Sequence, residues 1–179
     1  MINNLNEVNI NLLKKVEKLT GMSQFEAEVA IDRITKSTPS GFIKIKNLER
    51  EGKTTPDIQL VNNFVNRMPP YQGTIYRGIP FSKLEKLQSF LTLIQRNGGY
   101  TIDSMTSFTS DELVAEDYAY SAYPVIIRIK NNISGISIQE FLIYSENEII
   151  IPKGTKYRVT HLPKVIEPEE ILYIDMEEI

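Results

Sequence analysis

Residues Phe141–Pro152 read FLIYSENEIIIP and place two carboxylates, Glu146 and Glu148, at the start of an apolar run. A short isoleucine-rich run of this kind favours a β-strand. In a strand, residues i and i+2 project from the same face, roughly 6 to 7 Å apart. We therefore expect both carboxylates to point in one direction and Asn147 in the other, an arrangement typical of a functional site.

The composition limits what the rest of the chain can be. Its 179 residues fit one domain, 1–179, which is long enough to bury a core without disulfides or metals. The 20 Lys and Arg residues against 23 Asp and Glu residues give a net charge of -3, which argues against an extended nucleic-acid-binding face. The sequence has no cysteine, which excludes disulfides, thiol catalysis and thiolate metal sites. A protein or small-molecule partner fits this balance best.

The sequence also bears on location. No apolar run approaches the length of a membrane span, and the amino terminus lacks the basic and apolar regions of a signal peptide. We therefore expect a soluble monomer of the cytoplasm, with no membrane partner. The alternatives are that a leader has been removed or that a dedicated secretion system exports the protein, because the lack of a signal peptide fits both.

Apolar residues recur at helical spacing through the first 70 residues. They predict a helix near the amino terminus, a second that opens at the capping box of Ser23 and Glu26, and a third that begins at Thr55–Pro56. Between the last two, Lys36–Thr55 is rich in polar residues and shows only a short FIKIK alternation. We expect this segment to be a mobile, solvated connection, with contact to a partner as the alternative.

After Gly73 the pattern becomes mostly that of strands, which indicates an α+β fold. We expect a helical layer, 1–70, packed on a β-rich core, 71–179. Ser82 and Glu85 form a capping box before a helix that Gly98 ends. The expected strands are Thr74–Ile79, a short one at Met105–Ser110, Pro124–Lys130, Gly135–Ile138, Glu146–Pro152, Thr155–His161 and Glu170–Glu177.

A further helix, Glu112–Tyr120, follows the short strand. Thr109 or Ser110 can cap it, and the spacing predicts that Tyr118 faces inward with its apolar neighbours. The alternative for Tyr118, as for Tyr120 and Tyr123, is that its ring stacks on a ligand.

Two further groups of polar residues on the expected strands can carry chemistry. Arg77 lies on one face between Ile75 and Ile79, where a charged group needs a partner to offset its desolvation. Ser107 and Thr109 present their hydroxyls from one face of a strand. Taken singly, the arginine is explained by an ion pair, the hydroxyls by helix capping and the carboxylates by a solvated strand end.

Several common sites are absent from the sequence. There is no GxxxxGK[ST] loop and no GxGxxG after a strand. His161 is the only histidine, which argues against a Ser-His-Asp triad, and we interpret it as a surface or structural residue. A metal-dependent glycosidase is a remote alternative because no cluster of ligands is present.

Together, and in this order, the three groups resemble the arginine, serine and glutamate signature of mono-ADP-ribosyltransferases that modify arginine. The residues that carry the resemblance are Tyr76-Arg77-Gly78, Ser107-Phe108-Thr109 and Glu146-Asn147-Glu148, the last followed by IIIPKG. It covers Gly73 to Glu178 and implies an NAD-binding core of two sheets. The chain looks most like the small enzymes with which tailed bacteriophages modify host proteins, although secreted toxins share the same core.

The hydroxyl motif departs from the family pattern, which often reads Ser-Thr-Ser, because Phe108 stands in the middle. We align Ser107 with the first serine of that pattern and Thr109 with the last. A shifted register would give the role of Ser107 to Thr109 or Ser110.

The resemblance implies that NAD is the substrate, that no metal is needed and that the partner is a protein with an accessible arginine. Glu148 would stabilise the oxocarbenium-like transition state, and Glu146 would orient and activate the arginine. Arg77 would hold the NAD phosphates, and Ser107 would hold Glu148 or the ribose. The other implied cofactor-binding residues are Tyr76, Gly78 and Thr109.

Two rival functions remain open. An NAD glycohydrolase on the same fold would use water as the acceptor, and the presence of Glu146 argues against it. A non-catalytic module would bind a host protein through Lys36–Thr55, and the presence of Arg77, Ser107 and Glu148 argues against that. The expected turn around Phe141 and Tyr144 would meet the target protein if the family resemblance holds, with core packing as the alternative for both rings.

Overall fold

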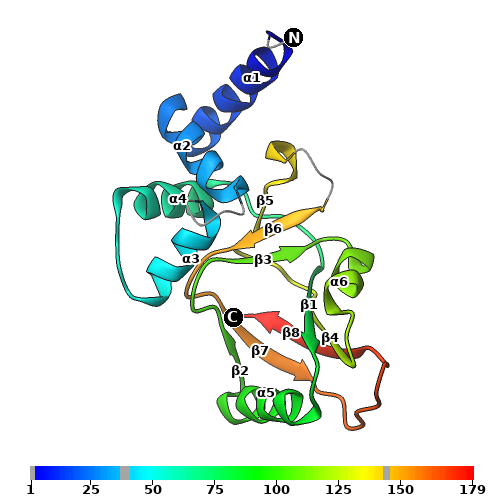
Figure 1. Cartoon of the computed structure of the whole chain (residues 1–179). Coiled ribbons are helices and arrows are strands. Elements are labelled where there is room, and N and C mark those ends of the chain that lie inside the picture. The colour runs from blue at the N-terminus through cyan, green and yellow to red at the C-terminus, as the bar shows by residue number, and fades with distance from the viewer. Residues whose placement is uncertain (1–2, 37–40, 143–145) are drawn as a thin grey trace. The chain divides into compact units, whose positions relative to one another are not determined.

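A computed structural model of the chain describes residues 3–36, 41–142 and 146–179. The chain divides into two compact units, Met1–Pro69 and Pro70–Ile179. Figure 1 shows that the first unit is helical and that the second contains the strands. No helix in the described ranges combines the length and apolar character needed to cross a membrane.

The first unit contains the helices α1 Asn3–Thr20, α2 Gln24–Thr35, α3 Phe42–Arg50 and α4 Pro56–Arg67. The predicted capping box begins α2, where the Ser23 side chain accepts from the Glu26 amide and the Glu26 side chain accepts from the Ser23 amide. Thr55 caps α4 by accepting from the amide of Ile58. These two helix starts are confirmed.

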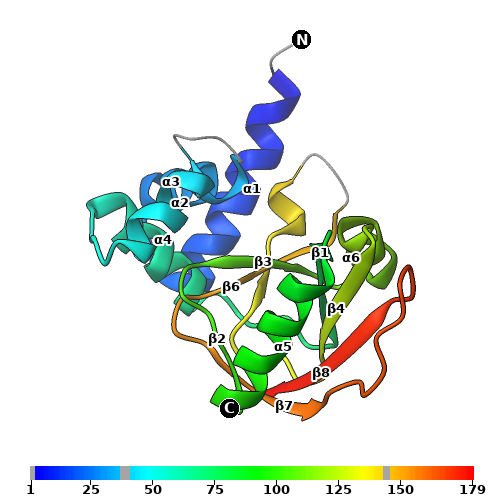
Figure 2. The ribbon, with the colours of Figure 1, turned by 60° about the horizontal axis from the view of Figure 1, so that its bottom comes forward.

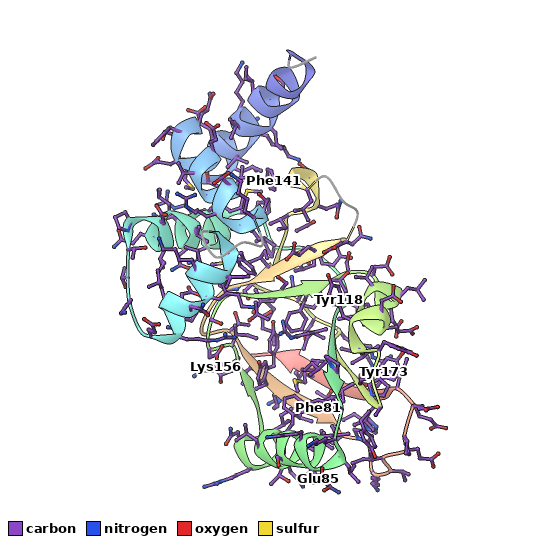
Figure 3. All side chains as sticks on the ribbon, viewed as in Figure 1. Phe81, Glu85, Tyr118, Phe141, Lys156 and Tyr173 are labelled. Carbon is purple, nitrogen blue, oxygen red and sulfur yellow. The ribbon has the colours of Figure 1, made fainter. Side chains whose placement is uncertain are left out.

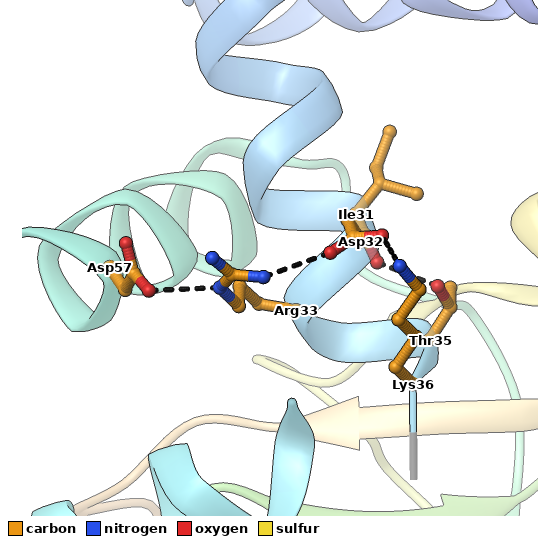
Figure 4. A network of polar contacts seen from close by, with 6 residues as sticks. All are labelled: Ile31, Asp32, Arg33, Thr35, Lys36 and Asp57. Carbon is orange, nitrogen blue, oxygen red and sulfur yellow. Dashed lines mark hydrogen bonds and ion pairs between the residues drawn. The ribbon is translucent and has the colours of Figure 1, made fainter. Parts of the chain in front are cut away.

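A polar network ties α2 to α4 (Figure 4). Arg33 donates from Nε to Oδ2 of Asp57 at 2.8 Å and from Nη1 to Oδ2 of Asp32 at 2.9 Å. Lys36 also pairs with Asp32, one helical turn away. One guanidinium thus joins carboxylates of two helices, which favours its charged form and raises the pKa of Arg33.

The expectation of a loop over Lys36–Thr55 is wrong, because the segment contains the helix α3. Phe42, Ile45 and Glu49 are its buried positions, at helical rather than alternating spacing. The isoleucines of FIKIK suggested alternation, but Ile43 is 44% exposed and Ile45 only 2%. The helix was hard to predict because no side chain caps its start and a buried glutamate interrupts its apolar face.

The described residues of the second unit form eight strands, which belong to one sheet. The strands are β1 Ile75–Phe81, β2 Gly99–Thr101, β3 Thr106–Thr109, β4 Tyr123–Ile129, β5 Ile136–Ser137, β6 Glu148–Ile151, β7 Lys156–His161 and β8 Leu172–Glu178. Its other elements are α5 Leu84–Asn97, α6 Glu112–Ala119 and the 3-10 helix η1 Gln139–Phe141. The predicted α+β fold is confirmed, and β2 is a strand that the sequence did not indicate.

The strand order is β2-β7-β8-β4-β1-β3-β6-β5, with β4 and β8 parallel and the other neighbours antiparallel. Two sheets were expected, and the strands instead form one hydrogen-bonded sheet with a narrow joint. At this joint β1 meets β3 through a single residue pair, Tyr76 and Thr109, whereas β1 and β4 pair along seven residues from Ile75 to Phe81. The joint brings the arginine strand beside the hydroxyl strand.

The two faces of the sheet are covered by different helices, as Figures 1 and 2 show. Leu87 and Ile94 of α5 belong to the main core together with the inward residues of β1, β4 and β8. Ala115 and Ala119 of α6 pack on Ile126, from the opposite face of β4. Because the two sides are closed by separate helices, the central strands are buried on both faces.

Two helix starts differ from expectation. The residue that caps α5 is Lys83, whose side chain makes no capping hydrogen bond, so the predicted box of Ser82 and Glu85 is wrong. The residue that caps α6 is Asp111, whose carboxylate accepts from the amide of Leu113 at 3.0 Å. At the other end of α5, Gly98 adopts a left-handed conformation with φ 68° and ends the helix as predicted.

Candidate active site

The pairing of β3 with β6 brings the hydroxyl motif against the carboxylate motif. Ser107 lies opposite Ile150 and Thr109 lies opposite Glu148, so these four residues share one face of the sheet. Ser107 and Glu148 are diagonal neighbours on that face. The Ser107 hydroxyl donates to Oε1 of Glu148 at 2.5 Å, a short hydrogen bond of the kind that charged acceptors form.

Arg77 reaches the same place from β1. Its Nη1 donates to the backbone carbonyl of Ser107 at 2.8 Å. Its guanidinium carbon also lies 5.7 Å from the centre of the Phe108 ring, within the range of a cation–π contact. A backbone carbonyl and an aromatic ring are thus among the partners of this charged group.

Phe108 explains why an aromatic residue can stand in the middle of the hydroxyl motif. It is 3% exposed and belongs to the main core, where its ring lies 6.1 Å from that of Tyr157. In a strand, its neighbours Ser107 and Thr109 must then point to the other face, toward the carboxylates. The apolar middle residue thus fixes the direction of both hydroxyls.

The two carboxylates are not placed as the strand pattern predicted. The strand β6 begins at Glu148, and Asn147 before it has a φ of 49° in the left-handed region. Glu146 therefore lies outside the strand, and the expectation of two carboxylates on one pleated face is wrong. Glu146 is exposed, whereas Glu148 is half-buried.

The residues of the hydroxyl motif hold this turn. Thr109 donates from Oγ1 to the carbonyl of Glu146 at 2.8 Å, and the amide of Ser110 donates to the carbonyl of Asn147 at 2.9 Å. From the other side, Oε1 of Gln139 accepts from the Asn147 amide at 2.8 Å. Backbone groups on both sides of the turn are thus satisfied by fixed partners, which holds Asn147 in a conformation that few residues adopt.

The Thr109 hydroxyl makes its hydrogen bonds with backbone groups. The residue is 6% exposed, and its hydroxyl also accepts from the amide of Asp111 at 3.0 Å. This geometry favours Ser107, rather than Thr109, as the hydroxyl that acts on the carboxylate.

Tyr118 of α6 belongs to this site, although its spacing predicted a core residue. It is 60% exposed, and its hydroxyl donates to Oε2 of Glu146 at 3.4 Å. The pKa of Tyr118 is raised by its partial removal from water and then by the negative charges of Glu146 and Glu148. Figure 3 labels Tyr118 on α6. The sequence signal that was missed is that α6 follows the hydroxyl motif directly, so one of its turns must lie beside the carboxylates.

The other residues of the aromatic-Arg-Gly motif lie beneath α6. Tyr76 packs against Ala115, Ala119 and Ile126. A Cβ added to Gly78 would lie 2.0 Å from the carbonyl oxygen of Ala115, so only glycine permits this close approach of helix and strand. Both residues position α6, and with it Tyr118.

The remaining sequence candidates are placed as follows. His161 is an exposed residue at the end of β7, which agrees with its interpretation as a surface histidine. Phe141 is half-buried in η1, and Tyr144 lies outside the described residues. Within the described part of the chain, no group of three or more acidic or histidine side chains is arranged to hold a metal ion.

No protein-family model and no curated protein matches the chain. Several solved structures do. The Vis toxin, an ADP-ribosyltransferase from Vibrio splendidus, matches with a TM-score of 0.64 and 18% identity over 100% of this chain and 86% of that one. The ADP-ribosyltransferase HopU1 of Pseudomonas syringae pv. Tomato DC3000 has a TM-score of 0.64 and 18% identity, over 89% and 78% of the two chains.

Two further matches are complexes with small molecules. C3stau2 from S. aureus, solved with NAD, has a TM-score of 0.61 and 14% identity over 96% of this chain and 94% of that one. Vis in complex with agmatine has a TM-score of 0.54 and 21% identity, over 94% and 74% of the two chains. At these identities the shared property is the architecture, and the chain has the fold of the ADP-ribosyltransferases.

Proposed function

We propose that the chain transfers ADP-ribose from NAD to an arginine side chain of a target protein and releases nicotinamide. The observation that carries the proposal is the contact of Ser107 with Glu148, held beside Arg77 where three strands meet. The fold shared with ADP-ribosyltransferases supports it, and so does the match to a relative solved with NAD.

The proposed reaction breaks the bond between the nicotinamide nitrogen and the ribose carbon. The bonding electrons leave with nicotinamide, which becomes neutral, and positive charge develops on the ribose ring. A nitrogen of the target guanidinium then bonds to that carbon and releases one proton to solvent. A carboxylate beside the ring favours this step because its attraction is stronger in the charged transition state than in the ground state.

Glu148 has the surroundings that this role needs. It is half-buried at the start of β6, and the Ser107 hydroxyl fixes one of its oxygens. A carboxylate held in this way loses little entropy when the ring charge develops. Arg77 supplies the positive charge that would face the NAD phosphates, and Ser107 would also reach the ribose.

Glu146 is the candidate residue for binding the arginine that accepts ADP-ribose. It is exposed, and the left-handed Asn147 sets it outside the strand that Glu148 begins. A carboxylate open to solvent can meet a guanidinium of another protein, with which it forms strong charge-assisted hydrogen bonds. The complex of Vis with agmatine, a guanidinium compound, supports arginine as the acceptor. The resemblance to phage enzymes extends the proposal to proteins of a host cell as targets.

The first prediction tests the whole proposal. Incubation with NAD labelled in the adenylate part and a bacterial extract will label protein and release nicotinamide. Glu148→Gln will lower both rates by about 10²- to 10⁴-fold, because it removes the charge that faces the transition state while keeping the shape. Glu146→Ala will lose transfer to protein and keep slow NAD hydrolysis.

The control is Glu177→Gln, which neutralises a half-buried carboxylate of β8 that pairs with the exposed Arg158. Its rates should equal those of the unaltered protein. If the unaltered protein releases no nicotinamide, the enzyme proposal is wrong. Equal losses of transfer and hydrolysis in Glu146→Ala would instead contradict the separate roles of the two carboxylates.

A further inference from the structure

Tyr118 occupies an unusual position on α6. Ala115 and Ala119 of this helix are fully buried against the sheet, whereas Tyr118 is turned away from them and is 60% exposed. Its hydroxyl nevertheless lies 3.4 Å from Oε2 of Glu146. An aromatic ring that stays on the surface and directs its hydroxyl to an exposed carboxylate is not explained by core packing.

The helix that carries Tyr118 is fixed with respect to the sheet. Asp111 caps it, Gly78 lets it approach β1, and Tyr173 donates to Oε1 of Glu116 at 3.5 Å. The backbone of Glu146 is held by Thr109, whose hydroxyl also accepts from the amide of Asp111 at the cap of α6. Tyr118 and the backbone of Glu146 are therefore both held in place. The side chain of Glu146 is the part whose orientation the Tyr118 hydroxyl can set.

We propose that Tyr118 is a positioning residue for Glu146, holding one carboxylate oxygen so that the other receives the guanidinium of the acceptor. This inference rests on the proposed function and deepens it, because it assigns a determinant of arginine specificity to α6. The tyrosine makes no bond with substrate and takes no proton. It restricts the rotamers of an exposed side chain that solvent would otherwise leave free.

Two properties of the pair fit this role. The raised pKa of Tyr118, caused by desolvation and then by the charge of Glu146, keeps the hydroxyl protonated and able to donate. The 3.4 Å separation is long for a hydroxyl–carboxylate bond, and such bonds commonly shorten when the substrate completes the site.

The test compares Tyr118→Phe with the unaltered protein, using NAD as donor and agmatine as a small acceptor. The ring is kept, so any effect of aromatic stacking stays, and only the hydroxyl is removed. We expect the KM for agmatine to rise about three- to tenfold, the scale of one ordinary hydrogen bond, because the contact is long and exposed. The ratio of transfer to NAD hydrolysis should fall by a similar factor, while the KM for NAD keeps its value.

The matched control is Tyr120→Phe, which removes the hydroxyl of a tyrosine two residues away that is 92% exposed. It should leave the KM for agmatine unaltered. An unchanged KM and ratio in Tyr118→Phe, in a protein that transfers ADP-ribose, would overturn the inference and leave the proposed function standing. No nicotinamide release from the unaltered protein would overturn the proposed function itself.

A second measurement does not depend on turnover. Tyrosines labelled at Cζ can be titrated by NMR, with Tyr118→Phe identifying the signal. If Glu146 faces Tyr118, Glu146→Gln will lower the pKa of Tyr118 because the negative charge beside it is removed. An identical pKa in both proteins would show that the two side chains do not meet in solution, and the inference would be wrong.

Discussion

Asn147 sets Glu146 outside the strand that Glu148 begins. With φ at 49° it turns the chain just before β6, so Glu148 follows the strand while Glu146 leaves it. Asparagine is one of the few residues that adopt this conformation readily. Its side-chain nitrogen also lies 3.5 Å from Oδ2 of Asp111, the cap of α6. A single residue thus links the carboxylate turn to the helix that carries Tyr118.

The prediction at this position uses a pair of variants. Asn147→Gly keeps the left-handed conformation, so its melting temperature and its ratio of transfer to hydrolysis should stay close to those of the unaltered protein. Asn147→Val disfavours that conformation, at a cost of about 1 to 3 kcal/mol, and would pull Glu146 into line with the strand. The ratio of transfer to hydrolysis of Asn147→Val should fall well below that of Asn147→Gly. Equal ratios for the two would show that the turn does not set the direction of Glu146.

Among the elements, α6 depends on one glycine of β1. A Cβ at position 78 would meet backbone atoms of the helix, at 2.0 Å from the Ala115 oxygen and 2.7 Å from the Ala119 nitrogen. These atoms belong to the helix itself and cannot rotate away, so the helix must move. Any movement of α6 carries Tyr118 with it.

Gly78→Ala should therefore destabilise the protein by about 3 kcal/mol, the upper end for an overpacked site. The comparison is Gly98→Ala, where a Cβ meets nothing within 4 Å and only the left-handed conformation is penalised, by about 1 kcal/mol. Urea unfolding measures both. A Gly78 variant that is no less stable than the Gly98 variant would mean that α6 adjusts without cost.

Elements whose signals are local were predictable. The capping box at Ser23, the start of α4 at Thr55 and the end of α5 at Gly98 each depend on residues within one helical turn. The helix α3 was missed because Gly41 offers no side-chain cap and Glu49 occupies a buried position. Its signal lies in packing within the helical unit, which local patterns do not contain.

For the candidate site, the sequence predicted which residues lie together better than it predicted their geometry. The order of the arginine, hydroxyl and carboxylate motifs pointed to Ser107 and Glu148. The pairing of β3 with β6 brings the Ser107 hydroxyl to 2.5 Å from Oε1 of Glu148. Side chains alternate between the two faces of a sheet only inside a strand. The left-handed Asn147 lies before the strand begins, so the position of Glu146 could not be predicted from this alternation. Tyr118 was assigned to the core because helical spacing gives the face of a residue but not what its hydroxyl reaches.

At the scale of the molecule, each unit is held by charged groups that join separate elements. In the helical unit Arg33 joins α2 to α4, and in the other unit Arg128 joins β4 to β8. Arg128 donates to both oxygens of Asp175, at 2.7 and 3.1 Å, from directly opposite positions of the parallel pair. It also stacks on Tyr173, with 5.1 Å between the guanidinium carbon and the ring centre. This pair lies under α6, in the middle of the sheet.

The pair makes stability depend on pH in a defined direction. The guanidinium of Arg128 lowers the pKa of Asp175 below its ordinary value of 3.8, with smaller contributions from Lys130 and His161. A carboxyl whose pKa is lowered by folding stabilises the folded state above its ordinary pKa. That contribution is lost as pH falls below 3.8 and through the folded pKa, since protonation then removes the charge.

Asp175→Asn should accordingly lower the free energy of unfolding at pH 7 by about 1 to 3 kcal/mol, because it leaves a partly buried guanidinium without its charged partner. The difference from the unaltered protein should shrink as the pH falls below 3.8 and the native carboxyl is protonated. Urea unfolding at pH 7 and at several acidic values measures it. Glu177→Gln is the control, since its pair with Arg158 is exposed and such pairs contribute about 0 to 1 kcal/mol. A difference for Asp175→Asn that stays constant with pH would show that the lost stability comes from packing rather than from charge.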